Sequence, residues 1–271
     1  MREITETREI QAISLNILKE IKHVCDENKI LYYLDAGTAL GAVRHAGFIP
    51  WDDDVDICMT RSEFNRFVDV FDNNSKKYYK LLSLETDAKY SLPLPKVIDT
   101  RTKLSQTRQN EVSALGIYVD IFVYDNIPDD LDIRKKAFEY QNKLQHQWSL
   151  FQYKVTKING IKSFSRSILQ KLLKEFNIQR YYALKLNKYA QTYNKTTTNS
   201  IGSMTYVSQR EKEIYSLDWF ANGVDMKFED DHFRVPQDFD SFLKIMYGDY
   251  MELPPAEQRV SHHNSKIYWI N

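Results

Sequence analysis

Four of the five residues at 52–56 are aspartates. Asp54 and Asp56 are separated by one valine, so on a β-strand both carboxylates would point to the same side. Two such carboxylates repel each other and raise each other's pKa, and a hard divalent cation with oxygen ligands removes that conflict. The spacing therefore predicts a metal site at Asp54 and Asp56. Asp52 and Asp53 are expected in the preceding loop, and an exposed acidic turn is the alternative.

A third carboxylate, Asp120, stands alone in the apolar segment 116–125 (GIYVDIFVYD). The segment has the bulky apolar side chains of a buried strand. A charge there requires a partner, either a bound cation or a basic side chain. We expect Asp120 to join the metal site, with an Arg or Lys partner as the alternative.

A glycine-containing turn comes before the aspartates. We expect a strand to end at Leu34, Gly37 to make a turn and a helix to open at Thr38. A helix N-terminus behind such a turn offers free amides to a phosphate. Gly37, Gly41 and Arg44 share one helix face, where Arg44 adds a fork for anionic oxygens. An ordinary structural turn is the alternative.

The order of these motifs is that of the nucleotidyltransferase superfamily: a glycine turn, Asp-x-Asp, then a single Asp on a later apolar strand. Thr38 stands where serine is commoner, and both offer a hydroxyl. The sequence of residues 36–59 (AGTALGAVRHAGFIPWDDDVDICM) resembles that of the LicD family of phosphocholine transferases, whose more distant relatives include fukutin-type proteins. Further similar stretches are KVIDTRT (96–102), GIYVDIFVYD (116–125) and MYGDYMELPPAEQR (246–259).

This resemblance runs from about residue 10 to 262 and implies a nucleotidyltransferase-type core with Mg²⁺ or Mn²⁺. It also implies transfer of phosphocholine from CDP-choline to a sugar of a teichoic acid or lipopolysaccharide type precursor, releasing CMP. Asp54 and Asp56 would hold metal, and Asp120 would complete a second metal site or accept the proton of the sugar hydroxyl. The substrate-binding residues would be Gly37, Thr38, Gly41, Arg44 and Lys96. A surface lysine is the alternative for Lys96.

Two other readings stay open. One keeps the fold and changes the reaction, to nucleotidyl transfer with release of pyrophosphate or to transfer of another phospho-alcohol such as glycerol phosphate. The other is a non-catalytic basic adaptor at anionic surfaces. Retention of all three carboxylates argues against the adaptor.

The helices and strands that position these residues are predicted to form an α+β fold. Hydrophobic periodicity and turn signals predict a small mixed sheet flanked by helices, then a mainly helical segment. Helices are expected at 4–27, 38–46, 60–71 and 237–247, and strands at 30–34, 55–59, 79–84, 95–99 and 116–125. The prolines near 95–99 favour an edge strand. We divide the chain into a catalytic core (1–128), a basic helical segment (129–200) and a C-terminal segment that lines the site (201–271).

Charge separates the middle of the chain from the rest. The chain has 37 basic and 37 acidic residues, so no overall basic excess points to nucleic acid. Residues 131–195, however, hold 14 Lys and Arg against three acidic residues. We expect this segment to contact anionic membrane or polymer peripherally. Two cysteines, no apolar leader and no spanning segment predict a cytoplasmic protein at the inner face of the membrane.

Overall fold

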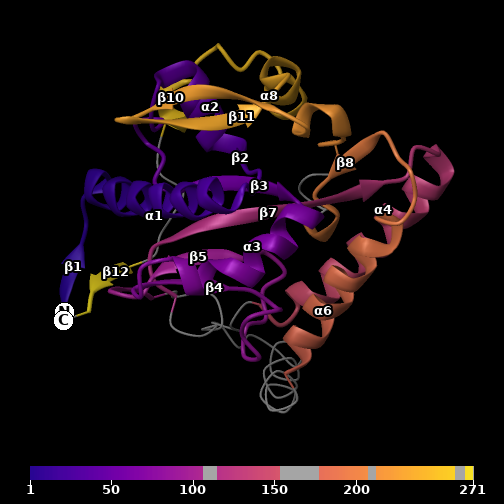
Figure 1. Ribbon diagram of the computed structural model, residues 1–271, viewed down its shortest axis with the longest axis horizontal. Coiled ribbons are helices and arrows are strands. Elements are labelled where there is room, and N and C mark those ends of the chain that lie inside the picture. Colours follow the sequence, from indigo (N-terminus) through magenta and orange to yellow (C-terminus); the bar gives the residue numbers. More distant parts are fainter. Residues whose placement is uncertain (106–114, 153–176, 207–211, 260–265, 271) are drawn as a thin grey trace.

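The computed structural model describes residues 1–105, 115–152, 177–206, 212–259 and 266–270 (Figure 1). Its centre is a mixed sheet in the order β2-β3-β7-β5-β4, in which only β3 and β7 run parallel. The strands are β2 (Tyr33–Leu34), β3 (Asp56–Thr60), β7 (Tyr118–Ile127), β5 (Lys96–Asp99) and β4 (Tyr79–Leu82). The short strands β8 (Ser200–Gly202) and β9 (Tyr215–Ser216) extend it from the far end of β7. This is the α+β class expected from the sequence.

Helices cover this sheet and a second, smaller sheet joins the two chain ends. In Figure 1, α1 lies across the central strands and the hairpin of β10 and β11 lies above it with α2 and α8. The small sheet has the order β1-β12-β6, and both termini lie beside it (Figure 1). The helices are α1 (Thr7–Asn28), α2 (Ala36–His45), α3 (Arg61–Asn74), α4 (Leu131–Ser149), α6 (Ile178–Ala190) and α8 (Phe239–Tyr247). The other strands are β1 (Arg2–Ile4), β6 (Thr102–Ser105), β10 (Gly223–Phe228), β11 (Asp231–Pro236) and β12 (Lys266–Trp269).

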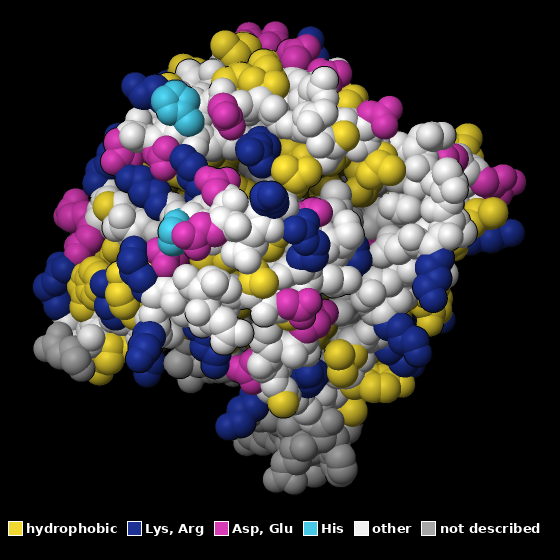
Figure 2. Space-filling model, in the orientation of Figure 1, with side chains coloured by type: hydrophobic (Ala, Val, Ile, Leu, Met, Phe, Trp, Pro, Cys, Tyr) yellow, Lys and Arg dark blue, Asp and Glu magenta, His cyan; other side chains and the backbone are white. Residues whose placement is uncertain are grey.

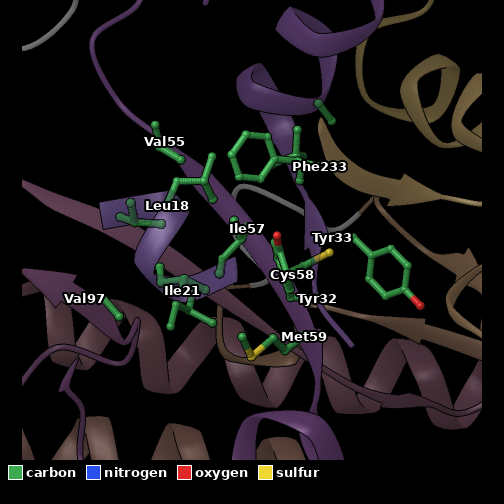
Figure 3. Close-up of a cluster of buried hydrophobic side chains, with 14 of the residues drawn as sticks. Leu18, Ile21, Tyr32, Tyr33, Val55, Ile57, Cys58, Met59, Val97 and Phe233 are labelled. Carbon is green, nitrogen blue, oxygen red and sulfur yellow. The ribbon is translucent and has the colours of Figure 1, made fainter. Parts of the chain in front are cut away.

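The core lies between α1 and the sheet, as the apolar stripe of α1 predicts. Leu18 and Ile21 from α1 pack with Ile57 and Met59 from β3, and all four side chains are fully buried (Figure 3). Cys25 and Cys58 are also buried and unlinked, and burial raises the pKa of the Cys25 thiol. Both cysteines are therefore packing residues.

Several expected elements differ from the structure in their bounds or place, and three of them show why. The first helix starts at Thr7 rather than residue 4, because residues 2–4 pair with β12 instead. The strand expected at 30–34 is reduced to Tyr33–Leu34. The prediction that 95–99 is an edge strand is wrong, since β5 lies between β4 and β7. Its prolines precede Lys96, so they remove no amide from the β5 ladder.

The basic segment is helical where it is described. The helices α4 and α6 pack together, and Gln141 of α4 donates to the carbonyl of Leu186 in α6 at 3.1 Å. Their exposed surface carries Lys side chains, and α6 has no acidic residue (Figure 2). Residues 153–176, with six of the basic residues, lie outside the described part. None of the described helices is long and apolar enough to cross a membrane, and peripheral membrane contact stays a prediction.

A buried ion pair joins α3 to the central sheet. The Nε and Nη2 atoms of Arg61 donate to the two carboxylate oxygens of Asp125 at 2.9 and 2.8 Å. Asp125 is 1% exposed and also accepts from Asn194 at 2.6 Å. The pair therefore connects the start of α3, the end of β7 and the segment after α6.

We expect Arg61→Met to lower the free energy of unfolding by about 3 kcal/mol or more, since Asp125 would stay buried without its cation. Urea denaturation measures this. The matched control is Lys244→Met, which removes an exposed pair with Asp240 and should cost less than about 1 kcal/mol. Equal losses in the two variants would contradict a structural function for the buried pair.

Candidate active site

The register of β3 and β7 brings two of the predicted carboxylates together. Asp56 pairs with Asp120 across the parallel ladder, and the Asp120 amide donates to the carbonyl of Val55 at 2.9 Å. Residues in register on adjacent strands project from the same face, with strands about 4.8 Å apart. Both side chains are only partly buried, so the carboxylates reach solvent where the two strands begin. The pair is therefore accessible to a ligand.

Asp54 lies two residues before β3, which corrects the expectation that Asp54 and Asp56 share a strand. The ladder with β7 begins only at Asp56. Asp52, Asp53 and Asp54 instead form a loop that α1 holds in place, because the Gln11 amide donates to the carbonyl of Asp52 at 2.6 Å. A loop can turn its carboxylates toward the strand pair without obeying the alternation of a strand.

Lys96 of β5 lies on the opposite side of β7 from Asp56. Asp56, Asp120 and Lys96 thus form a row across three neighbouring strands. Lys96 pairs in register with Asp120, and its ammonium forms an ion pair with the Asp120 carboxylate. The same ammonium lies 3.8 Å from the ring centroid of Tyr118. Lys96 is only 7% exposed, so it is not a surface lysine. Its predicted contact with a donor phosphate stays a prediction.

The acidic residues together affect the pKa of the Tyr118 hydroxyl. Burial is the main cause that raises the pKa of Tyr118, and the negative charges of Asp120, Asp54, Asp56 and Asp53 raise it further. Four carboxylates from one loop and two strands therefore act on one side chain. The loop and the strand pair belong to one site.

The turn before α2 is built differently from the sequence expectation. The helix begins at Ala36, which has φ 43°, and Gly37 is already helical. The carboxylate of Asp35 caps the helix by accepting from the Ala36 amide at 2.8 Å, and it also accepts from the Tyr124 hydroxyl at 3.0 Å. The sequence motifs do not identify Asp35, although its position directly before a helix is typical of an N-cap residue.

Gly37 and Thr38 both contact the acidic segment. A Cβ on Gly37 would lie 2.7 Å from Oδ2 of Asp52, so a larger residue would displace that carboxylate. The Oγ1 of Thr38 accepts from the amide of Asp56 at 2.9 Å, and Thr38 is 4% exposed. These residues therefore position the carboxylates, and their predicted contacts with phosphate stay predictions.

Gly41 and Arg44 contact other segments of the protein. A Cβ on Gly41 would lie 2.5 Å from the carbonyl oxygen of Gly47, so glycine permits close packing of the following loop. Nη1 of Arg44 donates to the carbonyls of Tyr250 and Glu252 at 2.7 and 3.2 Å. Burial lowers the pKa of Arg44. Arg44 thus anchors the turn after α8, and its predicted grip on phosphate stays a prediction.

The donor set fits a hard divalent cation. Among the described residues, no three His, Cys, Asp or Glu side chains form a cage that holds a metal by protein groups alone. Mg²⁺ needs no such cage, because it usually binds one or two carboxylates together with waters and substrate phosphates. Asp56 and Asp120, with Asp54 in the adjoining loop, supply that kind of partial, oxygen-only site.

Comparisons with known proteins agree with this geometry. Residues 29–152 match the family described as "LicD/FKTN/FKRP, nucleotidyltransferase domain". The chain is 30% identical over 279 residues to the Lipopolysaccharide cholinephosphotransferase LicD of Haemophilus influenzae, covering 99% of each chain. A shorter similarity, 35% identity over 74 residues, links 27% of the chain to 24% of an uncharacterized protein of Rickettsia typhi. All of the candidate site residues fall inside the family match.

We expect Thr38→Val to lower the free energy of unfolding by about 1–2 kcal/mol, because the Asp56 amide would lose its acceptor. Thr38→Ser keeps the hydroxyl and should stay close to the wild type. Urea denaturation of both variants measures the difference. A valine variant as stable as the serine variant would mean that this hydrogen bond does not hold the start of β3.

Proposed function

Because the chain belongs to the LicD/FKTN/FKRP family, we propose that it is a transferase that moves phosphocholine from CDP-choline to a sugar hydroxyl. The name of the full-length relative from Haemophilus influenzae describes a cholinephosphotransferase that acts on lipopolysaccharide. The acceptor here is proposed to be a glycan of a cell-surface polymer of the lipopolysaccharide or teichoic acid type. The observation that carries the proposal is the row of Lys96, Asp120 and Asp56 on three neighbouring strands.

The reaction exchanges one bond to phosphorus for another. The sugar hydroxyl attacks the phosphorus that bears choline, the phosphoanhydride bond breaks, CMP leaves, and the hydroxyl proton is released. The task of the protein is then to align the two reactants and to neutralise charge. A site with carboxylates and a buried ammonium beside each other is suited to both tasks.

The carboxylates would serve through a bound cation. Asp54, Asp56 and Asp120 would hold Mg²⁺ or Mn²⁺, which supplies charge neutralisation to the donor pyrophosphate and orients it for in-line displacement. Asp120 or a neighbouring carboxylate is the acceptor we propose for the hydroxyl proton. Lys96, already held between Asp120 and Tyr118, would offer a point charge to a donor phosphate oxygen.

The product released separates this reaction from its alternatives. Phosphocholine transfer gives CMP from CDP-choline, whereas nucleotidyl transfer gives pyrophosphate from CTP. Transfer of glycerol phosphate would use CDP-glycerol. An assay of the purified protein with each donor, a glycan acceptor and Mg²⁺ or EDTA decides among them. An adaptor without catalytic activity would release no product from any donor.

We expect Asp56→Asn and Asp120→Asn each to lower kcat with CDP-choline by about a hundredfold or more, since each removes a carboxylate that would hold the cation that neutralises the donor phosphates. The readout is CMP release at saturating Mg²⁺. The matched control, Asp69→Asn, changes an exposed aspartate on α3 and should keep wild-type turnover. Wild-type turnover in either site variant would remove Asp56 and Asp120 from the catalytic site.

A further inference from the structure

A cavity of about 340 Å³ lies next to the acidic loop, between the start of α1 and the small sheet of the two chain ends. Asp53, Asp54 and Tyr118 form the side that it shares with the candidate active site. The remaining lining residues come mainly from β1, α1, β6, β12 and the approach to β7.

One part of the cavity wall is aliphatic, and the rest of the lining is polar or charged apart from the ring of Tyr118. Ile4 of β1 pairs with Ile267 of β12, which in turn pairs with Leu104 of β6. These three side chains form a continuous apolar wall across the small sheet, and Ile10 and Ile117 add to it from the other side. The chain ends therefore give the cavity an apolar wall at the edge of a charged site.

The polar groups of the cavity favour a cation. Among the residues that the structure describes, the lining carries the carboxylates of Glu3, Asp53 and Asp54 and the ammonium of Lys266. Ser14 is 1% exposed, and its Oγ has no hydrogen-bond partner among the described residues. A buried hydroxyl without a partner indicates that a water or an oxygen atom of a ligand belongs beside it.

We propose that this cavity binds the trimethylammonium end of choline, an assignment that rests on the proposed function. A quaternary ammonium cannot donate a hydrogen bond, so aliphatic walls, an aromatic ring and nearby carboxylates suit it.

The place of the cavity agrees with the chemistry of the donor. In phosphocholine the nitrogen is separated from phosphorus only by one oxygen and two carbons, so the cation pocket must adjoin the phosphate site. Asp54 belongs to both, and Tyr118 contacts Lys96 while it lines the cavity. Choline and phosphate can therefore bind side by side, with Asp54 and Tyr118 between them.

The test uses a substitution that fills part of the cavity, and it measures ligand binding separately from catalysis. We expect Ser14→Leu to weaken binding of phosphocholine and of tetramethylammonium about tenfold or more, measured by calorimetric titration. It should also reduce the preference for CDP-choline over CDP-ethanolamine in kcat/KM about tenfold, because the smaller headgroup needs less of the cavity. The matched control is Ser75→Leu, which changes another serine with a buried unpartnered Oγ, in a different cleft.

Wild-type binding and donor preference in a folded Ser14→Leu variant would overturn the assignment, as would an equal loss in Ser75→Leu. Glu3→Gln serves as a second variant, since Glu3 is exposed on β1 and its change leaves the core intact. It should weaken tetramethylammonium binding about threefold, and no change would count against the cavity. If the wild type binds tetramethylammonium but releases no CMP from CDP-choline, the cavity assignment stands and the proposed function fails.

Discussion

Two like charges held side by side on adjacent parallel strands are the constraint on which the site depends. The register of β3 and β7 sets Asp56 beside Asp120, in a sheet whose neighbouring positions are fully buried and apolar. Such a pair is unfavourable unless positive charge is near it. Lys96 supplies one positive charge from β5, directly against Asp120. A bound divalent cation would compensate the remaining negative charge, so the arrangement is understandable as one made to bind a cation and the phosphates that accompany it.

Much of the surrounding structure holds this pair in place. Thr38 fixes the first amide of β3, Gln11 fixes the acidic loop, and Asp35 caps the helix that carries Thr38. The small sheet of the chain ends then closes a cavity along the acidic loop. Residues far apart in sequence therefore cooperate at one place: α1 and β1 from the start, β12 from the end, and the strand pair between them.

The parts predictable from the sequence were those that local chemistry determines. Asp120 was recognisable because a single charge in an apolar strand demands a partner, and the α1 stripe predicted its buried face. Asp54 was wrongly placed on a strand, because β3 begins where its ladder with β7 begins, and alternation alone does not show that. The contacts of Arg44 were not predictable either. Its spacing identifies a helix face, but the carbonyl that it binds belongs to Tyr250, 206 residues later in the chain.

The most direct test of the central claim is Mn²⁺ binding in the presence of CDP-choline, followed by electron paramagnetic resonance. The wild type, Asp56→Asn, Asp120→Asn and the double variant form a complete cycle. If the two carboxylates share one cation, each single variant should lose most of the affinity, and the double variant should lose little more than either. Wild-type affinity in both single variants, or losses that simply add, would show that Asp56 and Asp120 do not form a common cation site.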